Sequence, residues 1–263
     1  MGTATDAFSY FTQEVGISVD KSVNMLLKSP GVFRFSRSTL ARKCSWLAQT
    51  LNLPSVEAVS PLLRQATKIL TMELSKLPAI LLALDDLMGR KGAGVELAMK
   101  APMLATCEGL QLRRAMEALV KLGYNIDAAR SLVLHNPDLL HQHLEGPVQQ
   151  QKMQWVRQEL GWPVTKMLSE RVSYRSLCRM ASRLSFMRHL GLPDPGSLAY
   201  IGVASEPVFL AKVGKAAGRE VSAGKFAMWV AAWLQTPEGQ RWGFKPQKVR
   251  QTRQTVGGEE GSE

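Results

Sequence analysis

Helix-ending glycines and mid-period prolines recur along this chain about every 35 residues, and this repeat constrains the fold more than any other feature. Apolar residues followed by Gly or Asn close the predicted helices at 15–16, 51–52, 88–89, 122–123, 160–161 and 190–191. Between these ends stand Pro30, Pro102, Pro137 and Pro207, and the two missing prolines fall near Thr67 and Val172. Each period therefore predicts a short helix, a proline, a second short helix, a longer helix and a left-handed glycine.

The segments between the glycines have helical periodicity and almost no strand signal. Asn125 is a typical helix cap, Pro78 should kink or split the run Lys68–Met88, and a single long helix is expected over Tyr174–Leu190. Repeats of this length stack and share one continuous core. The sequence thus predicts an all-α fold, an α-solenoid of either hand with roughly six units. We expect it to form one domain over 1–240, followed by a basic and then acidic tail over 241–263.

Two stretches of the chain show the repeat in full, "YFTQEVGISVDKSVNMLLKSPGVFRFSRSTLARKCSWLAQTLNL" (10–53) and "LVKLGYNIDAARSLVLHNPDLLHQHLEGPVQQQKMQWVRQELGW" (119–162). They resemble the repeat of the mitochondrial transcription termination factor (mTERF) family. The shared pattern is a helix ending in Leu-Gly, a capped helix, a Pro-x-x-Leu segment and another helix ending in Leu-Gly. The resemblance extends over roughly residues 8–235, with departures at Asn52, Thr67 and Val172. Pentatricopeptide arrays have a similar period but lack the proline in the middle of the unit.

The resemblance implies a curved superhelix with a basic concave groove for nucleic acid. Members of the family work in mitochondria or chloroplasts, in transcription, RNA processing or ribosome assembly. The resemblance therefore predicts a mitochondrial protein, with a chloroplast protein as the alternative.

The charges of the chain agree with such a partner. Lys and Arg number 33 against 22 Asp and Glu, a formal net charge of +11, which favours nucleic acid, an acidic membrane or an acidic protein as partner. The residue nine positions before the helix-ending Gly or Asn is basic in three units, although one unit has Ile80 there. Equivalent positions on stacked units line one surface, which predicts a basic stripe. Its members are Lys43, Arg114 and Lys152, with Arg42 and Arg113 preceding two of them.

A second group of candidates is the arginine series Arg171, Arg175, Arg179 and Arg183, to which Arg188 is added as a further nucleic-acid contact. A step of four residues turns about 400° on a helix, so four such residues sweep a face of about 120°. Acidic neighbours are scarce: Glu170 precedes the series and no acid follows before Asp194. Like charges four residues apart repel, which favours a phosphate-binding role over an ordinary solvated helix face.

Other sites are poorly supported by the sequence. The segment Gly89–Gly94, "GRKGAG", lacks the Lys-Ser/Thr ending of a phosphate loop and follows a helix, so it predicts an inter-helix loop. His141 and His143 have no Cys or acidic cluster to complete a metal site. No catalytic constellation stands out, and we expect no enzyme activity, cofactor or metal. No apolar run reaches the length of a membrane span, and membrane is not expected as a partner.

The sequence therefore predicts a non-enzymatic nucleic-acid-binding protein. Dispersed charge without a base-reading code favours structured RNA, including ribosomal RNA, recognised through its backbone and shape. Binding of duplex DNA as a transcription terminator is the alternative within this class. A scaffold that binds protein within a ribonucleoprotein is the alternative of another class.

Overall fold

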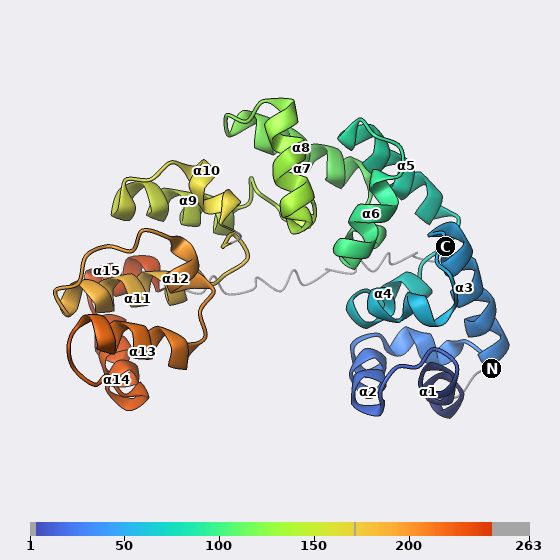
Figure 1. Ribbon diagram of the computed structural model, residues 1–263, viewed down its shortest axis with the longest axis horizontal. Coiled ribbons are helices and arrows are strands. Elements are labelled where there is room, and N and C mark those ends of the chain that lie inside the picture. The colour runs from blue at the N-terminus through green and yellow to red at the C-terminus, as the bar shows by residue number, and fades with distance from the viewer. Residues whose placement is uncertain (1–3, 171, 244–263) are drawn as a thin grey trace, which may run out of the picture. The chain divides into compact units, whose positions relative to one another are not determined.

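The computed structural model describes residues 4–170 and 172–243, and these residues are all-helical, as the sequence predicts. They form fifteen α-helices and five 3₁₀ helices, and no strand occurs among them (Figure 1). The chain divides into two compact units, 1–174 and 175–263, where the sequence predicts one repeat domain over 1–240. None of the described helices is long and apolar enough to cross a membrane.

Unit 1 consists of short and long helices that alternate in the predicted order. Its elements are α1 (Ala4–Gln13), α2 (Val19–Lys28), η1 (Pro30–Arg34), α3 (Arg37–Thr50), η2 (Glu57–Val59), α4 (Ser60–Gln65), η3 (Thr67–Leu70), α5 (Lys76–Met88), α6 (Ala93–Lys100), η4 (Pro102–Thr106), α7 (Gly109–Lys121), α8 (Ile126–His135), η5 (Pro137–His141), α9 (Pro147–Leu160) and α10 (Val164–Ser169). The run predicted over Lys68–Met88 is split, but the break lies at 71–75, and Pro78 sits in the first turn of α5.

The predicted helix ends are confirmed by the backbone. All six closing residues have a positive φ angle, including Asn52 at 51°, the one non-glycine residue in that region among the described residues. Left-handed backbone is costly for side chains with a Cβ, and Asn tolerates it better than most. The helix start at Asn125 is also confirmed, because its side chain accepts a hydrogen bond from the Ala128 amide at 2.8 Å.

The three mid-period prolines of unit 1 open 3₁₀ helices, which are the short helices predicted for the middle of each period. Pro30, Pro102 and Pro137 each stand at the start of one, and Thr67 holds the same place in η3. Ala66, before Thr67, has φ −127° and ψ 51°, close to the values of the residues before the three prolines. The backbone of the period is thus retained without the proline.

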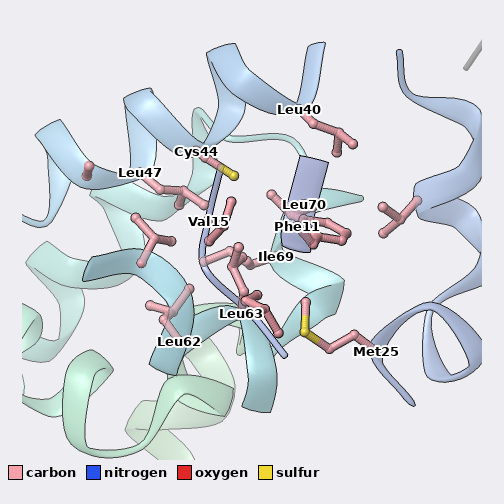
Figure 2. Packing of buried hydrophobic residues seen from close by; sticks show 14 of the residues in the cluster. Phe11, Val15, Met25, Leu40, Cys44, Leu47, Leu62, Leu63, Ile69 and Leu70 are labelled. Atoms are coloured by element: carbon pink, nitrogen blue, oxygen red, sulfur yellow. The ribbon is translucent and has the colours of Figure 1, made fainter. Parts of the chain in front are cut away.

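Equivalent elements of neighbouring periods contact one another within unit 1. Helix α1 packs on α3 and α5 packs on α7, while η3, η4 and η5 form successive contacts. The apolar side chains between them are buried: Figure 2 shows Phe11, Cys44, Leu63 and Ile69 packed together with neighbours from α2 and α3. Contacts between like elements thus join two pairs of neighbouring long helices and the successive 3₁₀ helices η3, η4 and η5.

The regular pattern ends near the boundary between the units. Val172, at the place of a missing proline, is buried, and neither it nor the residues that follow it up to 176 belong to a 3₁₀ helix. The long helix expected over 174–190 begins instead at Leu177, where the Ser176 side chain accepts a hydrogen bond from the Arg179 amide. Pro207 also departs from the pattern, because it lies in the first turn of an eleven-residue α-helix.

Unit 2 is built around aromatic side chains. Phe186 contacts Phe226 and Trp229 edge-on, with ring centroids 5.0 and 5.2 Å apart, and Trp233 stacks on Trp229. The last helix includes the buried Trp242 and so crosses the domain boundary expected at 240. The helices are α11 (Leu177–His189), α12 (Leu198–Gly202), α13 (Glu206–Ala216), α14 (Ala223–Trp233) and α15 (Pro237–Trp242). The tail beyond Gly243 lies outside the described residues.

Candidate nucleic-acid interface

A groove of about 650 Å³ lies in unit 1 where η3 and α5 meet the start of α7. Lys68, Lys76 and Arg113 line it, and all three are exposed. Its apolar lining includes Ile80 and Leu110. Helix α5 packs on α7 and η3 packs on η4, so the contacts between neighbouring periods position the cations.

Lys43 adjoins this groove from the preceding long helix. Its Nζ donates a hydrogen bond to the Met72 carbonyl oxygen at 3.4 Å, and Met72 lines the groove. The ammonium also lies 4.8 Å from the centre of the Phe35 ring. Burial, and then the neighbouring charge of Arg42, lowers the pKa of Lys43. Lys43 is therefore held against the edge of the groove, while Arg42 beside it is exposed.

Two of the groove's cations have no acidic partner. Among the described residues, Lys68 and Arg113 form no ion pair, and Lys76 has only Glu73, at 4.0 Å with both side chains largely exposed. An exposed pair of this kind contributes little. Glu108 is the single acid in the lining of the groove. The groove therefore presents a local excess of positive charge.

Some cations elsewhere in unit 1 are neutralised by the protein itself. Glu96 accepts hydrogen bonds from Lys100 and Arg90, which lower its pKa to about 2. Lys121 pairs with Glu145 at 2.8 Å. Exposed cations without an ion pair among the described residues also occur elsewhere in unit 1, for example Arg64 and Lys91, so the groove is distinguished by the gathering of its cations around one hollow.

The predicted basic stripe is present only in part. Arg42, Arg113 and Arg114 are exposed, and Arg114 lines an adjoining groove with His143 and Glu145. The position of Arg42 and Arg113, ten residues before the helix end, is occupied by Ala79 in α5, so the stripe is interrupted there. Lys68 and Lys76, which no sequence pattern singled out, supply the positive charge in the period that contains α5. The first residues of the other long helices, Ala4, Arg37, Gly109 and Pro147, are mostly not basic, so the repeat gives no signal for Lys76.

The prediction that Lys152 belongs to an exposed stripe is wrong. Its side chain is 4% exposed, and its Nζ donates a hydrogen bond to the Ser173 carbonyl oxygen at 2.5 Å. Gln149 donates to the same oxygen at 2.9 Å. Burial lowers the pKa of Lys152 to about 8. Lys152 thus fastens the segment after α10 to α9 and is inaccessible to a phosphate.

The arginine series does not form one face of one helix. Arg171 lies outside the described residues, and Arg175 is half-buried ahead of α11. Arg179 is exposed on α11, but Arg183 is 1% exposed and donates to the carbonyl oxygens of Ile201 and Ala204 at 3.1 and 2.7 Å.

Arg183 and Arg188 both serve structural contacts inside unit 2, so the prediction that they contact nucleic acid is not supported by their surroundings. The guanidinium of Arg183 lies 4.6 Å from the Phe209 ring centre, and burial lowers its pKa to about 10. Arg188 donates through Nε and Nη2 to the two carboxylate oxygens of Asp194, both at 2.9 Å. A bidentate pair of this geometry leaves little of the arginine's charge for another anion.

The other sequence candidates are accounted for by local structure. In the loop Gly89–Gly94, the amides of Gly92 and Gly94 donate to the Asp85 carboxylate, so the loop is held by an acid and cannot cradle a phosphate with these groups. His141 lies 3.7 Å from Asp138. The described residues contain no group of three or more His, Cys, Asp or Glu that could hold a metal ion.

Comparison with known proteins adds no relative: neither the models of known protein families nor the curated protein sequences match this chain.

Proposed function

We propose that this protein binds nucleic acid, with RNA favoured over DNA, through the basic groove of unit 1. The observation that carries the proposal is the set of exposed cations from neighbouring periods, Lys68, Lys76 and Arg113, of which two have no ion partner in the described part of the chain. The phosphates of a nucleic acid would supply the negative charges that the groove's cations do not find in the protein. Arg42 and Arg114 extend the positive surface to the neighbouring long helices.

Contacts of this kind position a nucleic-acid backbone without reading its bases. The lining contains no Asn, Gln or aromatic side chain set out to pair with or stack on bases. Shape and backbone recognition suits structured RNA, because the A-form helix is read mainly in this way. We accordingly propose a solenoid of mTERF type that acts on structured RNA, such as ribosomal RNA, in a mitochondrion or chloroplast. Duplex DNA is the alternative ligand.

The proposal is tested with a double charge reversal. We expect Lys68→Glu with Arg113→Glu to weaken binding of a labelled RNA hairpin about 10- to 100-fold near 0.1 M salt, and to lower the salt slope by about 1 for each phosphate that the protein no longer neutralises. The matched control is Lys21→Glu with Lys91→Glu, two exposed residues outside the groove with the same change in net charge. Equal effects of the two variants would show that only net charge matters and would refute the proposal that the groove is the binding site.

The same assay separates RNA from DNA. A duplex DNA of the same length is titrated beside the hairpin, and tighter binding of the hairpin is expected. Crosslinking of the tagged protein in its organelle, with parallel sequencing of bound RNA and DNA, then identifies the ligand. Dominant ribosomal RNA fragments support the RNA proposal, and a sharp peak on organellar DNA would replace it with transcription termination.

A protein-binding scaffold is the second candidate, and the apolar floor of the groove favours it. Leu110 is 58% exposed there, beside Ile80 and Met72. An apolar floor with a basic rim also fits an acidic amphipathic helix. If the hairpin and the duplex both fail to bind the unaltered protein, the scaffold becomes the better account.

A further inference from the structure

Helix α14 of unit 2 is apolar on faces that the unit does not cover. From Ala223 to Leu234 the only charged residue is Lys225. Phe226 and Trp233 are buried on the inner side, but Met228 is 74% exposed. Helices that are apolar on all sides are normally buried. The outer face of α14 is therefore an apolar surface that the described part of unit 2 leaves uncovered.

The uncovered face of α14 borders a groove of about 440 Å³ that lies wholly within unit 2. Ala227, Val230, Ala231 and Leu234 line it, and their three- and four-residue steps place them on one side of the helix. Helix α11 and the start of α13 complete its walls. The two alanines are small, so another helix can approach α14 closely at this point.

The groove also carries one exposed charge of each sign. Arg179 of α11 and Glu206 of α13 line it, and neither forms an ion pair with another described residue. An interface between two copies related by a two-fold axis must be complementary to itself. A surface with both a cation and an anion at an apolar groove meets that condition, whereas a partner of one charge would face repulsion from one of them.

We propose that this groove is a dimer interface, in which α14 packs on α14 of a second copy of the chain and Arg179 of each copy pairs with Glu206 of the other. The two alanines form the close contact of the two helices, and Met228 is covered at its margin. The proposal uses no residue of the unit 1 groove, so it succeeds or fails independently of nucleic-acid binding.

The mass of the full chain in solution provides the first test. Light scattering from about 1 to 100 µM should show a rise from 29.0 kDa toward twice that value. Ala231→Glu should raise the dissociation constant about 100-fold or more, because it buries an unpaired charge. Ala232→Glu, an exposed neighbour outside the groove lining, should change it less than about threefold. A monomer at every concentration, or equal effects of the two variants, overturns the proposal.

Mixing two charge-reversed chains tests the two-fold pairing. Arg179→Glu and Glu206→Arg each place like charges at both pairs of a homodimer, and each should weaken it. In an equal mixture, one Arg179→Glu chain and one Glu206→Arg chain form two attractive pairs, so native mass spectrometry should show mainly the heterodimer. A mixture with no more heterodimer than homodimer would refute the pairing.

Discussion

In unit 1, Lys68 and Arg113 line an open groove without acidic partners among the described residues, whereas in unit 2 Arg183 and Arg188 satisfy carbonyl and carboxylate oxygens of the same unit. Arg113 and Arg183 look alike in the sequence, because both are basic residues at regular positions of a helical repeat. The difference arises from what each helix packs against. A basic residue is available to a ligand only where the neighbouring element leaves it exposed and offers no acceptor.

The largest expected effect is on stability, at the buried Arg183 of unit 2. We expect Arg183→Met to lower the free energy of unfolding of unit 2 by about 2–4 kcal/mol, because the Ile201 and Ala204 carbonyl oxygens lose their donor inside the protein. Hydrogen exchange of the α11 amides measures this. Arg179→Met, on the exposed side of the same helix, should stay within about 0.5 kcal/mol when the variants are compared at a concentration at which the chain is monomeric. Similar destabilisation by both variants would contradict a structural role for Arg183.

A smaller effect is expected at Lys152, whose burial makes the free energy of unfolding depend on pH. Its pKa is about 8 in the folded protein and 10.5 when unperturbed, so between these values the unfolded chain binds more protons and stability rises with pH. The cost of burying the charge is fully present below pH 8. Between pH 7.5 and 10.5 we expect wild type to gain about 1–3 kcal/mol relative to Lys152→Met. Urea unfolding across this range measures the difference.

The control for this pH series is Lys91→Met, because Lys91 is exposed. Its stability relative to wild type should stay constant across the same range. A constant difference for Lys152→Met as well would show that Lys152 is hydrated and charged in the folded state.

The sequence predicts the local backbone of this protein well. Left-handed closing residues, the Asn125 cap and the prolines of unit 1 follow from the steric rules of single residues, and they appear where expected. The equivalence of Thr67 to a proline follows from spacing alone. Such features depend on a few consecutive residues, which is why sequence reasoning reaches them.

The exposure of a basic side chain depends on contacts between periods, and the sequence predicts it poorly. Arg114 and Lys152 occupy the same position before their helix ends, yet one is exposed and the other is covered by the segment around Ser173. That segment follows the last regular period, where Val172 replaces the proline. One local signal did exist for Arg183, since the residues from Met180 to Leu184 around it have short or apolar side chains and form a buried environment.

A third prediction compares two arginines directly. Arg113→Ala should weaken hairpin binding about 3- to 10-fold, because the phosphate at the groove loses its guanidinium partner. Arg188→Ala should change the affinity less than about twofold, since Asp194 already holds that side chain through two hydrogen bonds. Fluorescence anisotropy at one fixed salt concentration measures both. If Arg188→Ala weakened hairpin binding more than Arg113→Ala, the nucleic-acid contact would have to be assigned to unit 2 and not to unit 1.

The smallest expected effect is the change in stability when a proline replaces Thr67, which stands at the proline position of a regular period. Ala66 has backbone angles close to those of the residues before Pro30, Pro102 and Pro137, so Thr67→Pro should fit and reduce the entropy of the unfolded chain. The Thr67 hydroxyl loses its hydrogen bond to the Leu63 carbonyl oxygen, which offsets part of the gain. We expect a net change within about 0.5 kcal/mol of zero in thermal or urea unfolding.

Val172→Pro is the matched comparison, because it restores the other missing proline. Val172 is fully buried and no 3₁₀ helix starts there, so a prolyl ring of different shape and fixed φ must fit a site that is already packed. A destabilisation of about 2 kcal/mol or more is expected. If both prolines were tolerated equally, the period at 172 would have the same backbone as the one at 67. The irregularity between α10 and α11 would then have to originate outside the proline position.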